Sequence, residues 1–92
     1  MSKSILQDEK KCYFCGNIMN LERHHIFFGT ANRRKSEEFG CWVYLCKSHH
    51  TGILGVHFDK DADLMLKKQC QMQFEKLYCH EKFMHEFGRN WI

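Results

Sequence analysis

The chain has 92 residues, and its 14 Lys and Arg residues outnumber its 11 Asp and Glu residues to give a net charge of +3. A domain of this size buries well under three quarters of its unfolded surface, so we expect it to need disulfides, a metal or a partner chain for stability. No apolar run approaches the roughly 18 residues of a membrane-spanning helix, and the mild positive charge permits a nucleic-acid partner without requiring one.

Cysteine and histidine are abundant, with six and seven residues respectively, whereas proline is absent. A secreted disulfide scaffold requires an apolar signal segment, and the N-terminal sequence MSKSILQDEKK contains none. We therefore expect a cytoplasmic protein whose thiols stay reduced. In such a protein, closely spaced Cys near His indicates metal binding rather than disulfides.

Two short β-strands are predicted in the N-terminal half of the chain, at residues 21–29 and 41–46. Both segments are dense in β-branched and aromatic residues and are bounded by Gly or Asn, which is typical of strands. The polar segment between them, TANRRKSEEFG, predicts a long hairpin loop with a helical turn at Ser36–Phe39.

Two helices are predicted after His57. Asp61 is a suitable N-cap for a helix that begins near Ala62. A second, shorter helix is predicted at Glu81–Phe87, because Gly88 is suited to end it. An apolar stripe with spacings of four, four and three residues gives the first helix a face toward the core. The stripe consists of Leu66, Cys70, Phe74 and Leu77.

Two pairs of metal-type ligands lie in the N-terminal half, Cys12 with Cys15 and Cys46 with His49. The two-residue gap within each pair allows a tight turn to direct both side chains at one ion, and two such pairs complete a tetrahedral site of structural zinc. The free energy of zinc binding, on the order of 10 kcal/mol, would decide whether a domain with so small a core folds. The alternative is that these cysteines are small core residues.

Four further histidines lie in the same half of the chain: His24, His25, His50 and His57. Adjacent side chains of a strand point to opposite faces, so His24 and His25 can serve different tasks. A site that cleaves phosphodiesters needs a base to activate water, a divalent metal at the phosphate and a nearby cation. The segment contains candidates for all three, and the alternative is that the paired histidines are structural.

The segments CYFCG, LERHHIFFG and CWVYLCKSHH together resemble the zinc-bearing form of the HNH (ββα-metal) endonuclease motif. In that form, two pairs of zinc ligands bracket a β-hairpin and a helix that carry the catalytic histidines. The GVHF segment and the NRRKSEEFG loop are similar to those of small phage-encoded HNH proteins, including phage recombination-enhancement nucleases. The resemblance covers residues 12–57 and implies an α+β fold, a zinc-stapled ββα-metal finger with the C-terminal helices packed over it.

The resemblance also implies a role for each histidine. His25 would be the general base, while His24 and His50 would bind a catalytic divalent metal such as Mg2+, Mn2+ or Ni2+. His57 resembles the third metal ligand, although it follows His50 after seven residues, whereas the common motif has a spacing of about one helical turn.

One element of the motif is missing from this sequence. The middle Asn, which fixes the hairpin loop in the family, would fall near Cys41, where no Asn is present. Asn32 and Ser36 are the candidates to fix the loop in its place. Two arginines of the same loop are candidates to contact the DNA backbone. They are Arg33 and Arg34.

We therefore predict one HNH-like nuclease domain over residues 1–92, with the zinc knuckle and ββα-metal core at residues 11–58 and a helical extension at residues 59–92. The predicted function is metal-dependent hydrolysis of DNA by a monomer or weak dimer, in the host cytoplasm if the protein is encoded by a phage or prophage. Two other hypotheses remain open. One is a non-catalytic zinc module that binds nucleic acid or protein, and the other is a binuclear zinc cluster that uses all of these ligands.

Overall fold

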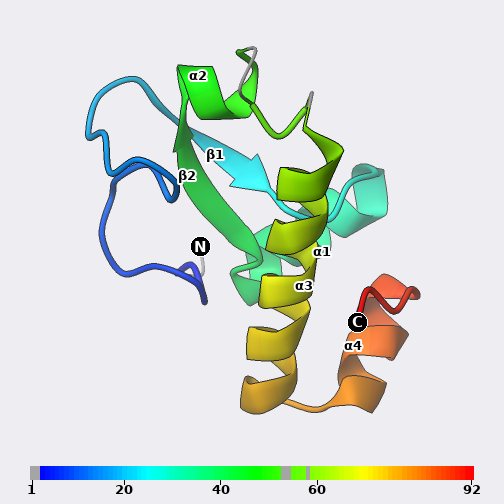
Figure 1. Ribbon diagram of the computed structural model, residues 1–92. Helices are drawn as coiled ribbons and strands as arrows, with labels where there is room; N and C mark the ends of the chain where they lie inside the picture. The colour runs from blue at the N-terminus through cyan, green and yellow to red at the C-terminus, as the bar shows by residue number, and fades with distance from the viewer. Residues whose placement is uncertain (1–2, 53–54, 58) are drawn as a thin grey trace.

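The computed structural model describes residues 3–52, 55–57 and 59–92, and it has an α+β architecture (Figure 1). Two strands form an antiparallel hairpin, and helices follow each strand and make up the C-terminal half. The elements in chain order are β1 (Leu21–His25), α1 (Thr30–Phe39), β2 (Trp42–Cys46), α2 (Lys47–His50), α3 (Lys60–Leu77) and α4 (His80–Phe87).

The hairpin pairs the first strand with the second so that Leu21 lies opposite Cys46 and His25 lies opposite Trp42. Both strands lie where the sequence predicted them, although β1 ends four residues earlier than the predicted strand. Because successive side chains alternate between the two faces of the hairpin, His24 is on the face opposite to that of His25. His24 lies beside buried Val43 on the inner face.

The loop predicted between the strands is wrong except for its helical turn at Ser36–Phe39, because all of Thr30–Phe39 forms the helix α1. Its polar residues are the exposed face of a helix rather than a loop, while Ser36 is fully buried and Phe39 is half-buried against the ring of Phe74. The helix ends at Gly40, which adopts the left-handed conformation at φ 75°. A Cβ at Gly40 would lie 2.1 Å from the carbonyl oxygen of Lys3, so glycine is also required for space.

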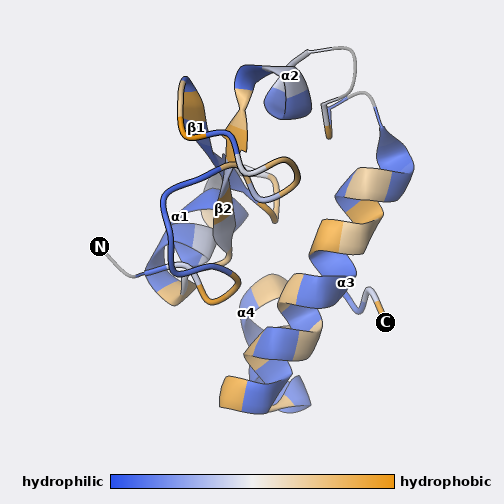
Figure 2. Ribbon diagram, turned by 60° about the vertical axis from the view of Figure 1, so that its left-hand side comes forward, coloured by the Kyte–Doolittle hydropathy of each residue, from blue (hydrophilic) through white to orange (hydrophobic). Residues whose placement is uncertain are grey.

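The helix α3 begins earlier than predicted, because Asp59 rather than Asp61 is its N-cap. The carboxylate of Asp59 accepts hydrogen bonds from the backbone N–H groups of Asp61 and Ala62, each at 3.1 Å. Figure 2 shows hydrophobic and hydrophilic residues alternating along α3. The first three residues of the predicted apolar stripe are fully buried, whereas Leu77, at the end of the helix, is 55% exposed.

The helix α4 begins one residue before its predicted start and ends as predicted at Gly88, which has φ 71°. The Sγ atom of Cys79 accepts the backbone N–H of Lys82 and caps the helix. Figure 1 shows α4 turning back against the lower part of α3. Buried Phe83 and Phe87 contact Phe74 of α3 and Phe27 after β1, so one core joins the hairpin to both C-terminal helices.

None of the helices in the described parts of the chain is long and apolar enough to span a membrane.

Candidate metal centres

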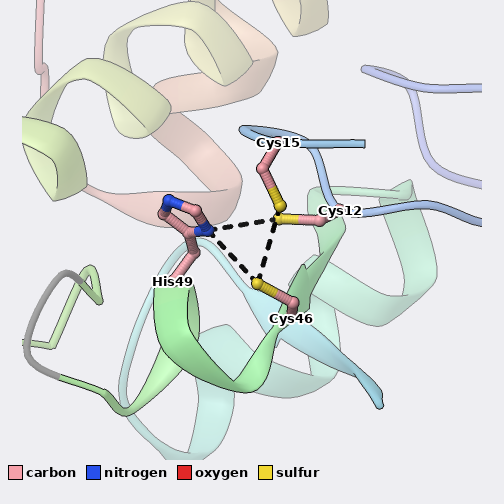
Figure 3. Close-up of side chains that lie close together, drawn as sticks. All are labelled: Cys12, Cys15, Cys46 and His49. Atoms are coloured by element: carbon pink, nitrogen blue, oxygen red, sulfur yellow. Dashed lines mark hydrogen bonds between the residues drawn. The ribbon is translucent and has the colours of Figure 1, made fainter. Parts of the chain in front are cut away.

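The four predicted zinc ligands meet at one point of the structure (Figure 3). Their ligand atoms all lie within 4.8 Å of one another, and the residues are Cys12, Cys15, Cys46 and His49. The Cys15 and Cys46 sulfurs are 3.7 Å apart, and His49 Nδ1 is 3.2 Å from Cys46 Sγ. Tetrahedral zinc with Zn–S bonds of about 2.3 Å has a sulfur–sulfur edge of about 3.8 Å. The spacing of these donors therefore fits one tetrahedral ion.

Local backbone structure brings these ligands together. The turn after Cys12 is closed by a hydrogen bond from the N–H of Gly16 to the carbonyl oxygen of Cys12, with Gly16 at φ 76°. Cys46 is the last residue of β2 and the N-cap of α2, which places His49 on the following turn. Burial acts to raise the pKa of Cys12, but hydrogen bonds from the surrounding backbone, that of Cys46 foremost, prevail and lower it to about 6. The lowered pKa favours the thiolate that zinc requires.

A second group consists of the three histidines that the sequence suggested as ligands of a catalytic metal. The ligand atoms of His24, His50 and His57 also lie within 4.8 Å of one another. The Nε2 atoms of His50 and His57 are 3.1 Å apart. The two groups share no ligand, so within the described chain the donors are arranged as two sites rather than as one binuclear cluster.

His24 fits the role of a metal ligand best. It is only 2% exposed, and its Nε2 is a buried nitrogen without a hydrogen-bond partner among the described residues. Burial, with a smaller contribution from neighbouring histidines, lowers the pKa of His24 to about 3. The imidazole is therefore neutral near pH 7, and its buried lone pair is available to an ion.

The seven-residue gap before His57 is bridged by a tight return of the chain. The backbone N–H of Val56 donates to the carbonyl oxygen of His49. A Cβ at Gly52 would lie 2.9 Å from the backbone of Ser48, and a Cβ at Gly55 would lie 2.5 Å from the carbonyl oxygen of His50. Both glycines are needed for this close approach, which brings the exposed His57 back to the other histidines.

A carboxylate that the sequence did not identify fixes the orientation of His50. Oε1 of Glu22, on β1, lies 3.1 Å from Nδ1 of His50. This contact leaves Nε2 of His50 directed at the other imidazoles. Metal-bound histidines commonly donate their second ring nitrogen to a carboxylate in this way, which fixes the tautomer and the ring orientation.

A second carboxylate, Glu37 on α1, holds the predicted general base. Oε2 of Glu37 lies 2.7 Å from Nε2 of His25, and the guanidinium of Arg23 contacts the other carboxylate oxygen. Because a carboxylate accepts hydrogen bonds, the proton of the neutral imidazole is on Nε2 and Nδ1 is left as the basic atom. Sequence reasoning missed Glu37. It falls in the helical turn predicted at Ser36–Phe39, but only the packing of α1 against β1 brings its carboxylate to His25.

His25 and the three-histidine group line one open cavity of about 520 Å³. Both candidate arginines are exposed, but Arg33 lines the same cavity and the neighbouring Arg34 does not. The structure therefore brings only one of the two candidate phosphate-binding arginines to the site.

Ser36 makes the contacts expected of a residue that fixes the connection between the strands. Its Oγ donates to the carbonyl oxygen of Phe27 at 3.4 Å, and its own carbonyl oxygen accepts the N–H of Cys41 at 2.7 Å. Ser36 thus joins α1 to both sides of the hairpin. Asn32, the other candidate, lines a neighbouring cavity.

No family model, curated protein or solved structure matches the chain.

Proposed function

We propose that the protein is a metal-dependent endonuclease of the HNH (ββα-metal) type that hydrolyses phosphodiester bonds of DNA. One observation carries the proposal. A carboxylate-held histidine, His25, opens onto the same cavity as three clustered imidazoles, and a separate sulfur-rich group lies apart from it. A base beside a divalent-metal site is the arrangement that phosphodiester hydrolysis requires.

Each residue has a task in this proposal. His24, His50 and His57 would hold a divalent metal, which supplies Lewis acidity at the scissile phosphate. His25 accepts the proton of the attacking water at Nδ1, while Glu37 keeps the imidazole oriented and stabilises its protonated form. Arg33 at the cavity wall binds a phosphate of the DNA backbone.

The sulfur-rich group has a structural role in the proposal. Zinc bound by Cys12, Cys15, Cys46 and His49 would occupy all four tetrahedral positions, which leaves none for a substrate. The three-imidazole group contains too few protein ligands to close a coordination sphere, so positions remain for water and phosphate. A nitrogen-rich site favours Ni2+ or Zn2+ over Mg2+, which prefers oxygen ligands.

The test is cleavage of supercoiled plasmid by the purified protein with added Mg2+, Mn2+ or Ni2+, with and without chelator. Wild type should cut the plasmid only when a divalent ion is present. His25→Ala should reduce the rate by about 10²- to 10⁴-fold, the usual cost of losing a general base, without loss of zinc. The matched control is His85→Ala, an exposed histidine on α4, which should cut as wild type does.

Two results would contradict the proposal. If His25→Ala cuts as fast as wild type, His25 is not the base. If zinc-loaded wild type binds DNA but cuts it with none of the three ions, a non-catalytic zinc module is the better interpretation.

A further inference from the structure

A second cavity of about 340 Å³ adjoins the cavity of the three histidines, and the two share the side chains of Phe27 and Phe28 as walls. The ring of Phe28 stacks near that of His57, with centroids 6.1 Å apart, and meets the ring of His24 edge-on. Phe28 is 46% exposed. A ligand in the second cavity would therefore lie directly beside the candidate metal site.

The polar groups around this second cavity suit an anion. Among the described residues that line it, two are cations, one is an amide and none is a carboxylate. They are Lys67, Arg89 and Asn32. Lys67 is only 6% exposed, and its Nζ lies 4.1 Å from the centre of the Phe28 ring. The cation is paired with Asp63 at 2.6 Å.

Arg89, unlike Lys67, is exposed and has no ion pair in the described parts of the chain. Its guanidinium lies 4.1 Å from the centre of the Trp91 ring. A purely structural role accounts for Lys67 and Asp63, which form a buried pair. It does not account for an exposed arginine held against an aromatic ring at the mouth of a cavity.

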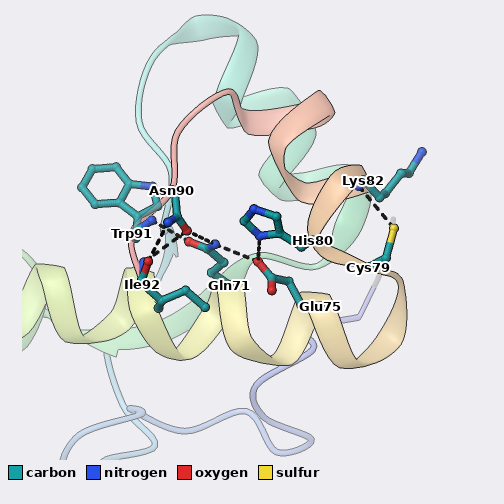
Figure 4. Close-up of polar contacts among 8 residues, drawn as sticks. All are labelled: Gln71, Glu75, Cys79, His80, Lys82, Asn90, Trp91 and Ile92. Atoms are coloured by element: carbon teal, nitrogen blue, oxygen red, sulfur yellow. Dashed lines mark hydrogen bonds and ion pairs between the residues drawn. The ribbon is translucent and has the colours of Figure 1, made fainter.

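The C-terminal segment that carries Arg89 and Trp91 is fastened to α3 through buried Gln71 (Figure 4). The side-chain oxygen of Gln71 accepts the backbone N–H of Trp91, and its side-chain nitrogen donates to Oδ1 of Asn90, each at 2.7 Å. The segment has no regular secondary structure, yet these bonds fix its position. Arg89 and Trp91 are thus held in place before any ligand binds, which lowers the entropic cost of binding.

We propose that the second cavity binds the nucleotide next to the scissile phosphate of a DNA strand, with the phosphate at Arg89 and the base against Trp91 and Phe28. This inference rests on the proposed nuclease function and names its substrate more closely. Because a base in a duplex is stacked on its neighbours, the nucleotide must leave the stack to enter the cavity. The protein is therefore expected to prefer single-stranded or frayed DNA.

The test measures binding alone, without an added catalytic metal. A fluorescently labelled oligonucleotide of about 12 nucleotides, single-stranded or paired with its complement, is titrated with protein and followed by anisotropy. Wild type should bind the single strand more tightly than the duplex. Arg89→Gln should weaken single-strand binding several-fold and make its salt dependence shallower by about 0.7 in log–log slope, the value for one lost phosphate contact.

Trp91→Leu should weaken single-strand binding by about tenfold, a loss typical of one base–aromatic stack. The matched control is Lys68→Gln, an exposed neighbour of Lys67 that lines a different cavity and should bind as wild type does. Zinc content and circular dichroism report whether each variant is folded. If Trp91→Leu unfolds, Arg89→Gln decides, because its side chain is exposed.

The inference is overturned if Arg89→Gln binds the single strand as Lys68→Gln does, or if wild type prefers the duplex. Either result leaves the plasmid experiment untouched, because that experiment depends on His25. Conversely, plasmid that stays intact with every metal would remove the nuclease function while the preference for single strands is still measurable.

Discussion

The two candidate metal sites differ in the type of their ligands and in how completely those ligands would surround an ion, although both are formed by the N-terminal half of the chain. The Cys3His group contains three sulfurs and one imidazole at tetrahedral spacing, and Cys12 and Cys46 are buried. The histidine group contains no sulfur, and its three members line one open cavity. Sulfur-rich, complete sites stabilise folds, and open sites leave positions for chemistry.

The comparison also separates what each site requires from its surroundings. The Cys3His group depends on two local turns, each with two residues between its ligands. The histidine group and the neighbouring His25 depend on carboxylates from other elements, Glu22 on β1 for His50 and Glu37 on α1 for His25. Loss of one ligand of the Cys3His group should therefore unfold the protein. Loss of one histidine or one carboxylate at the other site should change only the step in which that residue acts.

The largest expected effect is that of Cys12→Ser. Loss of a buried thiolate removes most of a zinc-binding free energy on the order of 10 kcal/mol, which a domain of this size cannot lose and remain folded. Circular dichroism should show an unfolded chain, and elemental analysis should find no zinc. Cys79→Ser, at an exposed position where a serine can also cap α4, is the control and should keep both zinc and fold. A well-folded Cys12→Ser protein would show that the two sites do not differ in this way.

His57→Ala should give a smaller effect that is confined to the histidine site. The loss of even an outer contact to a metal ligand costs about 10- to 100-fold in affinity, so the loss of the ligand itself should exceed this for Ni2+. High Mg2+, which relies less on imidazole, should partly restore cleavage. The measurement is the concentration of each ion at half-maximal cleavage, with zinc content as the control. An unchanged titration would remove His57 from the metal site.

The smallest expected effects distinguish the two supporting carboxylates from each other. Glu22→Gln should weaken binding of the divalent metal by about tenfold and leave the rate at saturating metal unchanged, because it acts on His50. Glu37→Gln should leave binding of the divalent metal unchanged and slow cleavage about tenfold or more at saturating metal, since Glu37 acts on His25. Metal titrations of both variants separate the two effects. If both variants change the same quantity, the division of tasks between metal ligand and base is wrong.

The parts of the protein that sequence alone predicted are those that depend on local spacing. The Cys12 and Cys15 turn, the strands and the apolar stripe of α3 follow from residues close to one another in the chain. The contact of Glu37 with His25 could not be predicted, although Glu37 lies in the predicted helical turn at Ser36–Phe39, because it depends on how α1 packs against the hairpin. The burial of Lys67 likewise depends on packing that the sequence does not show, since its environment is formed by Phe28 and by the distant Trp91.

One peptide bond joins the two sites, because His49 belongs to the Cys3His group and His50 to the histidine group. Zinc bound by the Cys3His group would fix the backbone at His49 and would thereby restrict the position of His50. The two binding equilibria are then linked, and each ion raises the affinity for the other by the same factor. We expect the metals to load in order, zinc first, so that zinc starvation silences the catalytic site however much Mg2+ or Mn2+ the solution contains.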